Sequence, residues 1–196
     1  MNRLMKSTLF YKKDYNIIRQ RLLEESELLK NHLDDYKKLV DFLVVAEDHR
    51  FYSHPGYDII GINRALYKDL FCGKKEGAST IEQQLVRVLT EDYRYSIRRK
   101  LKEIYLATKL KYLADKYTLA AIYLDVSRYG TNYKNLDQIL KKFETKLSKD
   151  MDDNVCAEII ARLKYPEPQN HNPQRMILIE RRKRHIIHLY KLHNAK

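Results

Sequence analysis

The stretch of sequence that decides the fold lies at residues 47–58 and reads Glu47-Asp48-His49-Arg50-Phe51-Tyr52-Ser53-His54-Pro55-Gly56-Tyr57-Asp58. It follows the apolar run Leu43-Val44-Val45-Ala46, and its Ser-His-Pro-Gly segment is a turn signal. Glu47 therefore stands where a buried helix meets a turn, a position from which a carboxylate can act as a general base. Taken alone, an acidic pair at such a position is more often a solvated helix end.

Composition and periodicity around this stretch favour a mainly α fold. The chain has 196 residues, enough for one domain with a hydrophobic core, and its five Gly and four Pro are too few for a turn-rich β fold. Apolar residues recur at helical spacing along most of the chain, with a loop expected over residues 73–77. The expected helices cover about residues 14–45, 59–71, 79 onward, 96–114, 118–129, 132–149, 152–163 and 174–192.

The chain is strongly basic, with 38 Lys and Arg against 26 Asp and Glu and a formal charge of +12. Such an excess favours a polyanionic partner: a nucleic acid, an anionic bilayer surface or a phosphorylated substrate. Cys72 and Cys156 lie far apart without metal-ligand spacing, and we expect two free thiols. No signal peptide and no run of about 20 apolar residues is visible, so we expect no membrane-spanning helix.

A second stretch with candidate functional residues covers residues 77–87, Gly-Ala-Ser-Thr-Ile-Glu-Gln-Gln-Leu-Val-Arg. Ser79 and Glu82 have the spacing of a capping box, in which the serine caps the helix and the glutamate reaches back. Free N–H groups at such a helix start favour anions, and Arg87 lies two turns further on. By itself this is an ordinary capped helix.

A third stretch, residues 98–103, reads Arg-Arg-Lys-Leu-Lys-Glu. On a helix, Arg99, Lys100 and Glu103 share one face because they are three and four positions apart. Glu103 is thus expected to lie beside two cations. A salt-bridged surface helix explains this stretch when it is taken alone.

Together, and in this order, the three stretches resemble the signature of the bacterial peptidoglycan glycosyltransferases of family 51, which includes monofunctional transglycosylases and the glycosyltransferase domain of bifunctional penicillin-binding proteins. The family's motifs look like Glu-Asp-x-x-Phe-x-x-His-x-Gly, Gly-x-Ser-Thr-Ile-x-Gln-Gln and Arg-Lys-x-x-Glu, followed by a fourth around Tyr-Leu-Asn with a later Gly. The matching residues are Glu47, Asp48, Phe51, His54 and Gly56; Gly77, Ser79, Thr80, Ile81, Gln83 and Gln84; Arg99, Lys100 and Glu103; and, in part, Tyr123, Leu124 and Gly130.

The sequence departs from the family pattern at four positions. Asp125 replaces the Asn of the fourth motif, and Ala121 replaces a Glu that usually precedes its Tyr. Tyr95 stands where an Arg is expected, and Arg87 stands where the family usually has Lys. These changes concern efficiency and substrate more than the type of reaction.

The resemblance implies a lysozyme-like glycosyltransferase fold with a head and a small membrane-facing jaw. Residues 59–71 fall where that jaw would be, although simple core packing explains their apolar side chains equally well. The implied domain organisation is an N-terminal helical extension over residues 1–38 and a glycosyltransferase domain over residues 39–196.

The activity implied by the resemblance is polymerisation of lipid II into β-1,4-linked glycan strands, with inversion and release of polyprenyl diphosphate. Glu47 and Glu103 are the expected catalytic residues: Glu47 as the base, and Glu103 as the group that orients the cations or holds a metal. A Mg or Mn divalent cation bound to the diphosphate is the expected cofactor. The expected substrate-binding residues are Asp48, Phe51, His54, Ser79, Thr80, Gln83, Gln84, Arg87, Arg99, Lys100 and Tyr123.

The implied partners are lipid II, the lipid-linked glycan chain, the membrane surface and other proteins of cell-wall synthesis, and we expect no nucleic acid. The implied location is the membrane of the cell envelope, on a side that the sequence does not fix. Two alternatives remain: a non-catalytic relative that binds lipid II, and a lysozyme-like glycan hydrolase with Glu47 as general acid. Lipid II binding without polymerisation would favour the first, and release of soluble muropeptides the second.

Overall fold

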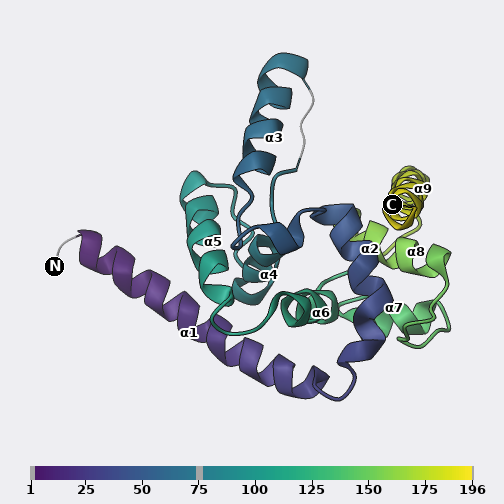
Figure 1. Ribbon diagram of the computed structural model, residues 1–196, viewed down its shortest axis with the longest axis horizontal. Coiled ribbons are helices and arrows are strands. Elements are labelled where there is room, and N and C mark those ends of the chain that lie inside the picture. Colours follow the sequence, from purple (N-terminus) through teal and green to yellow (C-terminus); the bar gives the residue numbers. More distant parts are fainter. Residues whose placement is uncertain (1–2, 74–76, 196) are drawn as a thin grey trace. The chain divides into compact units, whose positions relative to one another are not determined.

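The computed structural model describes residues 3–73 and 77–195, and these residues are mostly helical (Figure 1). Their only extended pairing is an isolated bridge between Gly130 and Glu167, so the mainly α prediction is confirmed. No helix of the described part is long and apolar enough to span a bilayer. In chain order, the elements are α1 (Arg3–Leu29), η1 (Leu33–Tyr36), α2 (Lys37–Glu47), η2 (Phe51–Ser53), α3 (Ile59–Cys72), α4 (Ile81–Thr90), α5 (Ile97–Leu110), α6 (Lys116–Val126), α7 (Leu136–Lys142), α8 (Asp153–Lys164) and α9 (Pro173–Asn194).

The chain divides into two compact units. The first unit holds residues up to 27 and residues 50–119, and it contains most of α1 together with η2, α3, α4, α5 and the start of α6. The second unit holds residues 28–49 and 120 onward, and it contains η1, α2, most of α6, α7, α8 and α9.

In the first unit, α4 packs on α5 through an apolar face that includes Leu85 and Leu106. α1 joins this unit through polar as well as apolar contacts. The Lys102 ammonium of α5 is buried and donates to Asp14 of α1 and to Asp92, each at 2.8 Å. Burial lowers the pKa of Lys102, but the two carboxylates outweigh it and the pKa is raised.

Helix α3 belongs to the same unit but extends away from α4 and α5 (Figure 1). Asp58 caps its start, with Oδ1 accepting from the N–H of Ile60 at 3.1 Å, and Gly73 ends it in the left-handed region with φ of +59°. The predicted helix over residues 59–71 is confirmed. Its large apolar residues are mostly exposed, namely Ile59, Ile60, Tyr67, Leu70 and Phe71.

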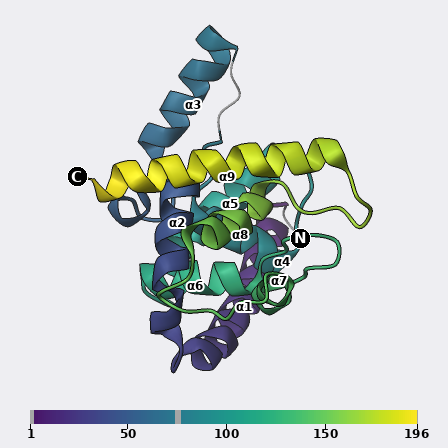
Figure 2. The same ribbon diagram turned by 90° about the vertical axis from the view of Figure 1, so that its right-hand side faces the viewer.

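In the second unit, α9 lies across α2 and α8 (Figure 2). Phe42 of α2 stacks on Tyr190 of α9, with ring centroids 3.8 Å apart, and Ile186 of α9 is fully buried. The Lys183 ammonium of α9 donates to Glu158 of α8 at 3.1 Å. The predicted helices over residues 152–163 and 174–192 are confirmed, with Asp152 and Asn172 as their N-caps.

The single helix expected over residues 14–45 is wrong, because the chain breaks between α1 and α2 and forms only the short η1. The break falls on Asn31, His32, Asp34 and Asp35, and Asn and Asp side chains compete with helical backbone hydrogen bonds. Three other expected helices are shorter than predicted: α5 ends at 110, α6 at 126, and α7 covers only 136–142 of the expected 132–149. The loop expected over residues 73–77 lies partly outside the described residues.

Candidate active site

In the first unit, the start of α4 is fastened to the glycine that ends the first motif. The Thr80 hydroxyl accepts from the N–H of Gln83 at 3.3 Å and donates to the carbonyl oxygen of Gly56 at 2.9 Å. Gly56 has φ of +108°, and a Cβ added there would lie 2.6 Å from the carbonyl oxygen of Ala107 in α5. Only glycine therefore allows the turn to approach α5 so closely.

The predicted capping box is wrong in its residues. Thr80, one position later than expected, is the N-cap of α4, and Ser79 instead accepts from the Lys100 ammonium at 2.7 Å. Glu82 does not reach back to the cap. Its side chain is buried and forms a salt bridge with the Lys116 ammonium, in place of the hydrogen bond to a backbone N–H that a capping box would have.

Three cations surround Glu103, and we call this group the cationic cluster: Arg87, Arg99 and Lys100 around the carboxylate. Glu103 Oε1 accepts from Arg87 Nε at 2.8 Å and from Arg99 Nη1, while Oε2 accepts from Arg87 Nη2 at 3.3 Å and lies 3.8 Å from Lys100 Nζ. Glu103 is only 1% exposed. Three positive charges against one negative charge leave the cluster with a net positive charge that favours an anion.

Lys100 also joins the cluster to the second motif. Its ammonium donates to Ser79 Oγ at 2.7 Å and to Gln83 Oε1 at 2.5 Å. Burial lowers the pKa of Lys100, Glu103 raises it, and the nearby Arg87 and Arg99 lower it further. The net result is a lowered pKa, because burial is the largest of these effects.

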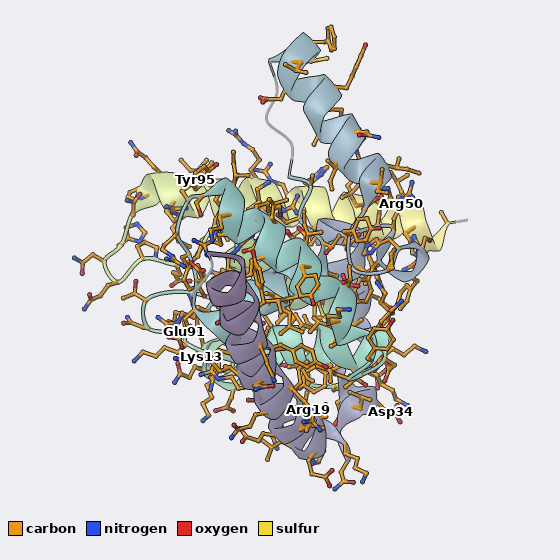
Figure 3. All side chains as sticks on the ribbon, turned by 90° about the vertical axis from the view of Figure 1, so that its left-hand side faces the viewer. Lys13, Arg19, Asp34, Arg50, Glu91 and Tyr95 are labelled. Atoms are coloured by element: carbon orange, nitrogen blue, oxygen red, sulfur yellow. The ribbon has the colours of Figure 1, made fainter. Side chains whose placement is uncertain are left out.

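A pocket of about 580 Å³ opens beside the cationic cluster. Its lining combines cationic side chains and serine hydroxyls with aromatic and apolar side chains, and Tyr95, just before the N-cap of α5, is fully exposed (Figure 3). Such a lining suits a ligand that carries both a polyanionic and an apolar part. The lining residues are Ser79, Arg87, Tyr93, Tyr95, Ser96, Ile97, Arg99 and Lys100.

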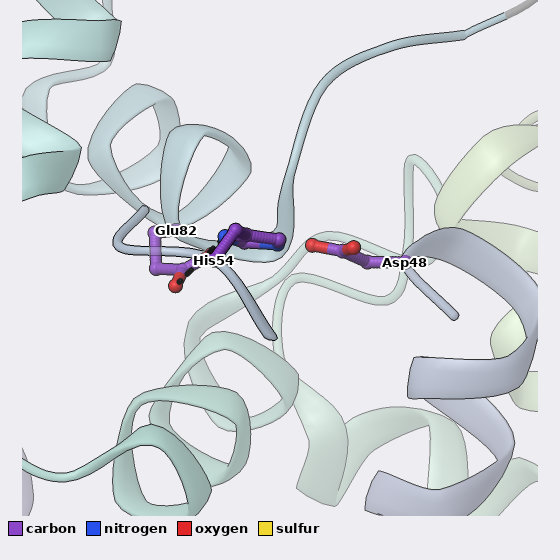
Figure 4. A group of neighbouring side chains, drawn as sticks. All are labelled: Asp48, His54 and Glu82. Carbon is purple, nitrogen blue, oxygen red and sulfur yellow. Dashed lines mark ion pairs between the residues drawn. The ribbon is translucent and has the colours of Figure 1, made fainter. Parts of the chain in front are cut away.

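Phe51 and His54 of the first motif are buried in the same unit. His54 Nδ1 accepts from the N–H of Gly56 at 3.2 Å and lies 4.0 Å from Glu82 Oε1 (Figure 4), and the Lys116 ammonium lies 4.4 Å from the centre of the Phe51 ring. Imidazole and carboxylate are groups that bind divalent cations, so the unit has metal-binding donors at this point. Figure 4 also draws Asp48, which belongs to the second unit.

In the second unit, Glu47 is the last residue of α2, and its carboxylate is held by an arginine of α9. Arg182 Nη2 donates to Glu47 Oε1 at 2.9 Å and to the carbonyl oxygen of Ala46 at 2.6 Å. The next residue, Asp48, is buried, and its N–H donates to the carbonyl oxygen of Val44 at 3.0 Å. Sequence reasoning missed the partner of Glu47, because nothing in the run Arg181-Arg182-Lys183-Arg184 distinguishes Arg182.

The fourth motif lies on and after α6, in the same unit. Tyr123 is buried, and Ala121, which replaces a Glu of the family, is fully buried in an apolar core. Asp125, which replaces an Asn, accepts from the Tyr36 hydroxyl at 2.8 Å. Burial raises the pKa of Asp125, and the Tyr36 hydrogen bond only partly offsets this.

The first unit thus brings together Ser79, Thr80, Gln83, Arg87, Arg99, Lys100 and Glu103. It also holds the buried Phe51 and His54, and Gln84, which is half-buried on α4. The second unit holds Glu47, Asp48 and Tyr123. The first unit thus holds a net positive cluster around the buried carboxylate of Glu103, and the second unit holds the carboxylate of Glu47, fixed at the end of a helix.

The chain belongs to the transglycosylase family, whose sequence profile matches residues 17–191. This confirms the resemblance inferred from the motifs. The chain is 33% identical over 114 residues to the monofunctional glycosyltransferase of Staphylococcus saprophyticus, covering 58% of this chain and 42% of that protein. It is 33% identical over 135 residues to penicillin-binding protein 1A of Vibrio cholerae, covering 68% and 16% respectively.

A third relative, the monofunctional glycosyltransferase of Staphylococcus haemolyticus, is 32% identical over 130 residues, covering 66% of this chain and 47% of that protein. The chain therefore spans less than half the length of these relatives.

Proposed function

We propose that the chain is a peptidoglycan glycosyltransferase that polymerises lipid II into β-1,4-linked glycan strands and releases polyprenyl diphosphate. The observation that carries this proposal is the cationic cluster beside a pocket whose lining is part cationic and part aromatic. A diphosphate joined to a lipid has the two kinds of surface that this pocket offers. Membership of the transglycosylase family supports the same reaction.

In the proposed reaction, the 4-hydroxyl oxygen of an acceptor sugar attacks the anomeric carbon of the donor. A new C–O bond forms as the bond from that carbon to the diphosphate oxygen breaks, and the configuration inverts. Glu47 takes the hydroxyl proton as general base. The electron pair of the broken bond leaves with the polyprenyl diphosphate, whose charge Arg87, Arg99 and Lys100 stabilise.

Glu103 has a supporting role in this proposal, because both of its oxygens already accept from arginine. It fixes the direction in which the cations point and offsets part of their mutual repulsion. A metal ion would reach Glu103 only by displacing one of these ion pairs, so Glu103 is a poor fit to a metal ligand in this arrangement. A Mg or Mn ion would accompany the diphosphate as its counter-ion.

The binding residues of the second motif act through the same cluster. Ser79 and Gln83 accept from Lys100, and Thr80 fixes the start of α4 on Gly56. We propose that Asp48, Phe51, His54, Gln84 and Tyr123 shape the substrate site, largely by packing, since four of them are buried and Gln84 is half-buried.

The proposed partners include the lipid-linked glycan chain and the membrane surface, as well as other proteins of cell-wall synthesis. The exposed apolar side chains of α3 support a membrane-facing jaw, because a row of such residues is unusual on a water-exposed helix. The proposed domain organisation is a helical extension over residues 1–38 and a glycosyltransferase domain over residues 39–196. The buried pair of Asp14 with Lys102 supports an extension that packs on the domain.

The test is polymerisation of labelled lipid II with Mg²⁺ in detergent, comparing the wild type with Glu47→Gln and with Glu180→Gln as a matched control on the half-exposed side of α9. We expect lipid-linked glycan strands from the wild type and the control, and none from Glu47→Gln. Retained polymerisation by Glu47→Gln would refute the role of Glu47. Binding of lipid II without growth of strands, or release of soluble muropeptides, would refute the proposed reaction.

A further inference from the structure

The side chain of Arg182 contacts two groups at the C-terminal end of α2. Its Nη2 atom donates to Glu47 Oε1 at 2.9 Å and to the carbonyl oxygen of Ala46 at 2.6 Å. Both side chains are mostly buried, with 13% of Arg182 and 16% of Glu47 exposed. Through this contact α9 reaches the proposed base, which lies 135 positions earlier in the chain.

The backbone that carries Arg182 is itself held firmly against α2 and α8. Tyr190, two turns further along α9, stacks on Phe42 of α2, and Ile186 between them is fully buried. Lys183, the next residue, donates to Glu158 of α8 at 3.1 Å. The guanidinium is therefore presented from a helix that packs on both α2 and α8, and it is itself mostly buried.

The two acceptors of Arg182 differ in what the contact does for them. The Ala46 carbonyl belongs to the last turn of α2, where carbonyl groups have no partner within the helix. A cation there stabilises the helix end. The Glu47 carboxylate is a freely rotating group on a long side chain, and a hydrogen bond from a fixed guanidinium restricts it to one orientation.

We infer that Arg182 is a positioning residue for Glu47. It binds Oε1, fixes the side chain at the end of α2 and so directs the second oxygen, Oε2, to the proton of the acceptor hydroxyl. The inference rests on the proposed function, in which Glu47 is the base. Its consequence is that α9 contributes to catalysis without touching the reacting atoms.

A purely structural role for Arg182, as a cap of α2 through Ala46, makes a different prediction. Loss of a cap lowers stability but leaves the catalytic rate of the folded protein unchanged. Loss of a positioning contact lowers kcat while leaving KM nearly unchanged, because substrate binding depends on the cationic cluster of the other unit. The two roles are therefore separated by kcat, by KM and by the thermal midpoint measured on the same variants.

The experiment measures kcat and KM for lipid II polymerisation in detergent for the wild type, Arg182→Ala, Arg182→Lys and Arg181→Ala. Arg181 is the matched control because it is exposed on the same turn and its removal changes the net charge equally. We expect kcat of Arg182→Ala to fall about 100-fold, the loss that a misplaced catalytic group causes, with KM changed by no more than about twofold. Arg182→Lys should lose less, because an ammonium can still reach one of the two acceptors.

Added guanidinium chloride supplies the second readout. At tens of millimolar, well below denaturing concentrations, it should raise kcat of Arg182→Ala about tenfold by occupying the vacated position, since one pairing contact to a charged group contributes on the order of 1.5 kcal/mol. Equal concentrations of sodium chloride should have no such effect, and neither salt should activate the wild type or Arg181→Ala.

The outcomes separate the inference from the proposed function. A wild type that forms no strands would refute the proposed function and the inference with it. A wild type that polymerises lipid II, together with a folded Arg182→Ala variant whose kcat is unchanged, would refute the inference alone. So would a loss of kcat that guanidinium does not restore, or one that the fall in the thermal midpoint fully accounts for.

Discussion

Replacement of Glu103 by Gln should destabilise the protein and, at the same time, make its stability depend on diphosphate. The carboxylate is 1% exposed and is the shared partner of Arg87, Arg99 and Lys100. Glutamine keeps the size and removes the charge, so the three cations remain close together without an anion. Of the three, Arg99 has the least access to water, with 11% of its side chain exposed, and it bears most of the cost.

The expected loss is about 3 kcal/mol, at the lower end of the range for breaking a buried ion pair, because Arg87 and Lys100 are partly exposed. For a domain of this size, that corresponds to a fall in Tm of roughly 6–12 °C. Thermal unfolding of the wild type and of Glu103→Gln would measure it. Glu180→Gln is the control, because Glu180 is half-exposed and its pairs with Lys183 and Arg184 should contribute less than about 1 kcal/mol.

Inorganic diphosphate makes the same experiment specific to the cationic cluster. An anion that binds the three cations replaces the missing carboxylate, so millimolar diphosphate should raise the Tm of Glu103→Gln more than that of the wild type. Equal shifts for both proteins would show that the anion does not take the place of the missing carboxylate. A Tm of Glu103→Gln within about 2 °C of the wild type would show that the buried ion pairs do not stabilise this unit.

Three further predictions concern the scaffold around the site. Gly56→Ala should lower the free energy of unfolding by about 2 kcal/mol or more, because a Cβ there meets the backbone of α5 at 2.6 Å. The Cβ of Gly73→Ala meets nothing within 4 Å, so this variant should lose only the roughly 1 kcal/mol due to its positive φ. Urea unfolding of both variants would compare the two losses. Lys102→Met should cost about 3 kcal/mol at neutral pH, because it removes the buried ammonium shared by Asp14 and Asp92 and leaves Asp92 with Arg94 as its ion-pair partner. A stability equal to the wild type would contradict this. Thiol labelling of the folded protein should modify the exposed Cys72 and spare the buried Cys156, because burial raises the pKa of the Cys156 thiol to about 12. Equal labelling rates at the two cysteines would contradict the burial of Cys156.

Much of the local structure could be predicted from the sequence because its signals are short-range. Asp152 and Ser96 stand directly before apolar repeats, and each caps the helix that follows it. The helix at residues 59–71 has its own cap and a terminal glycine. The three motifs, read in order, identified the family, which is a statement about spacing and residue type and needs no tertiary contact.

The errors have tertiary or competing local causes. Apolar residues recur at helical spacing throughout residues 14–45, yet α1 ends before the Asn and Asp residues between 31 and 35, where the chain turns. Ser79 and Thr80 are both good N-caps, and the choice between them was made by Lys100, which binds Ser79, and by Gly56, which accepts from Thr80. Neither partner could be found from the spacing of a capping box.

The two glutamates that the motifs single out have environments that favour different roles. Both oxygens of Glu103 accept hydrogen bonds from arginine, so a proton could reach this carboxylate only by breaking an ion pair in a buried position. Glu47 is held through Oε1 by one arginine, and its side chain retains 16% exposure. A group that must accept a proton in each turnover needs an accessible oxygen, whereas a group that arranges cations needs all of its contacts to persist. The asymmetry between the pairs therefore favours Glu47 as the base and Glu103 as the organiser of the diphosphate site, a division that residue type alone could not have made.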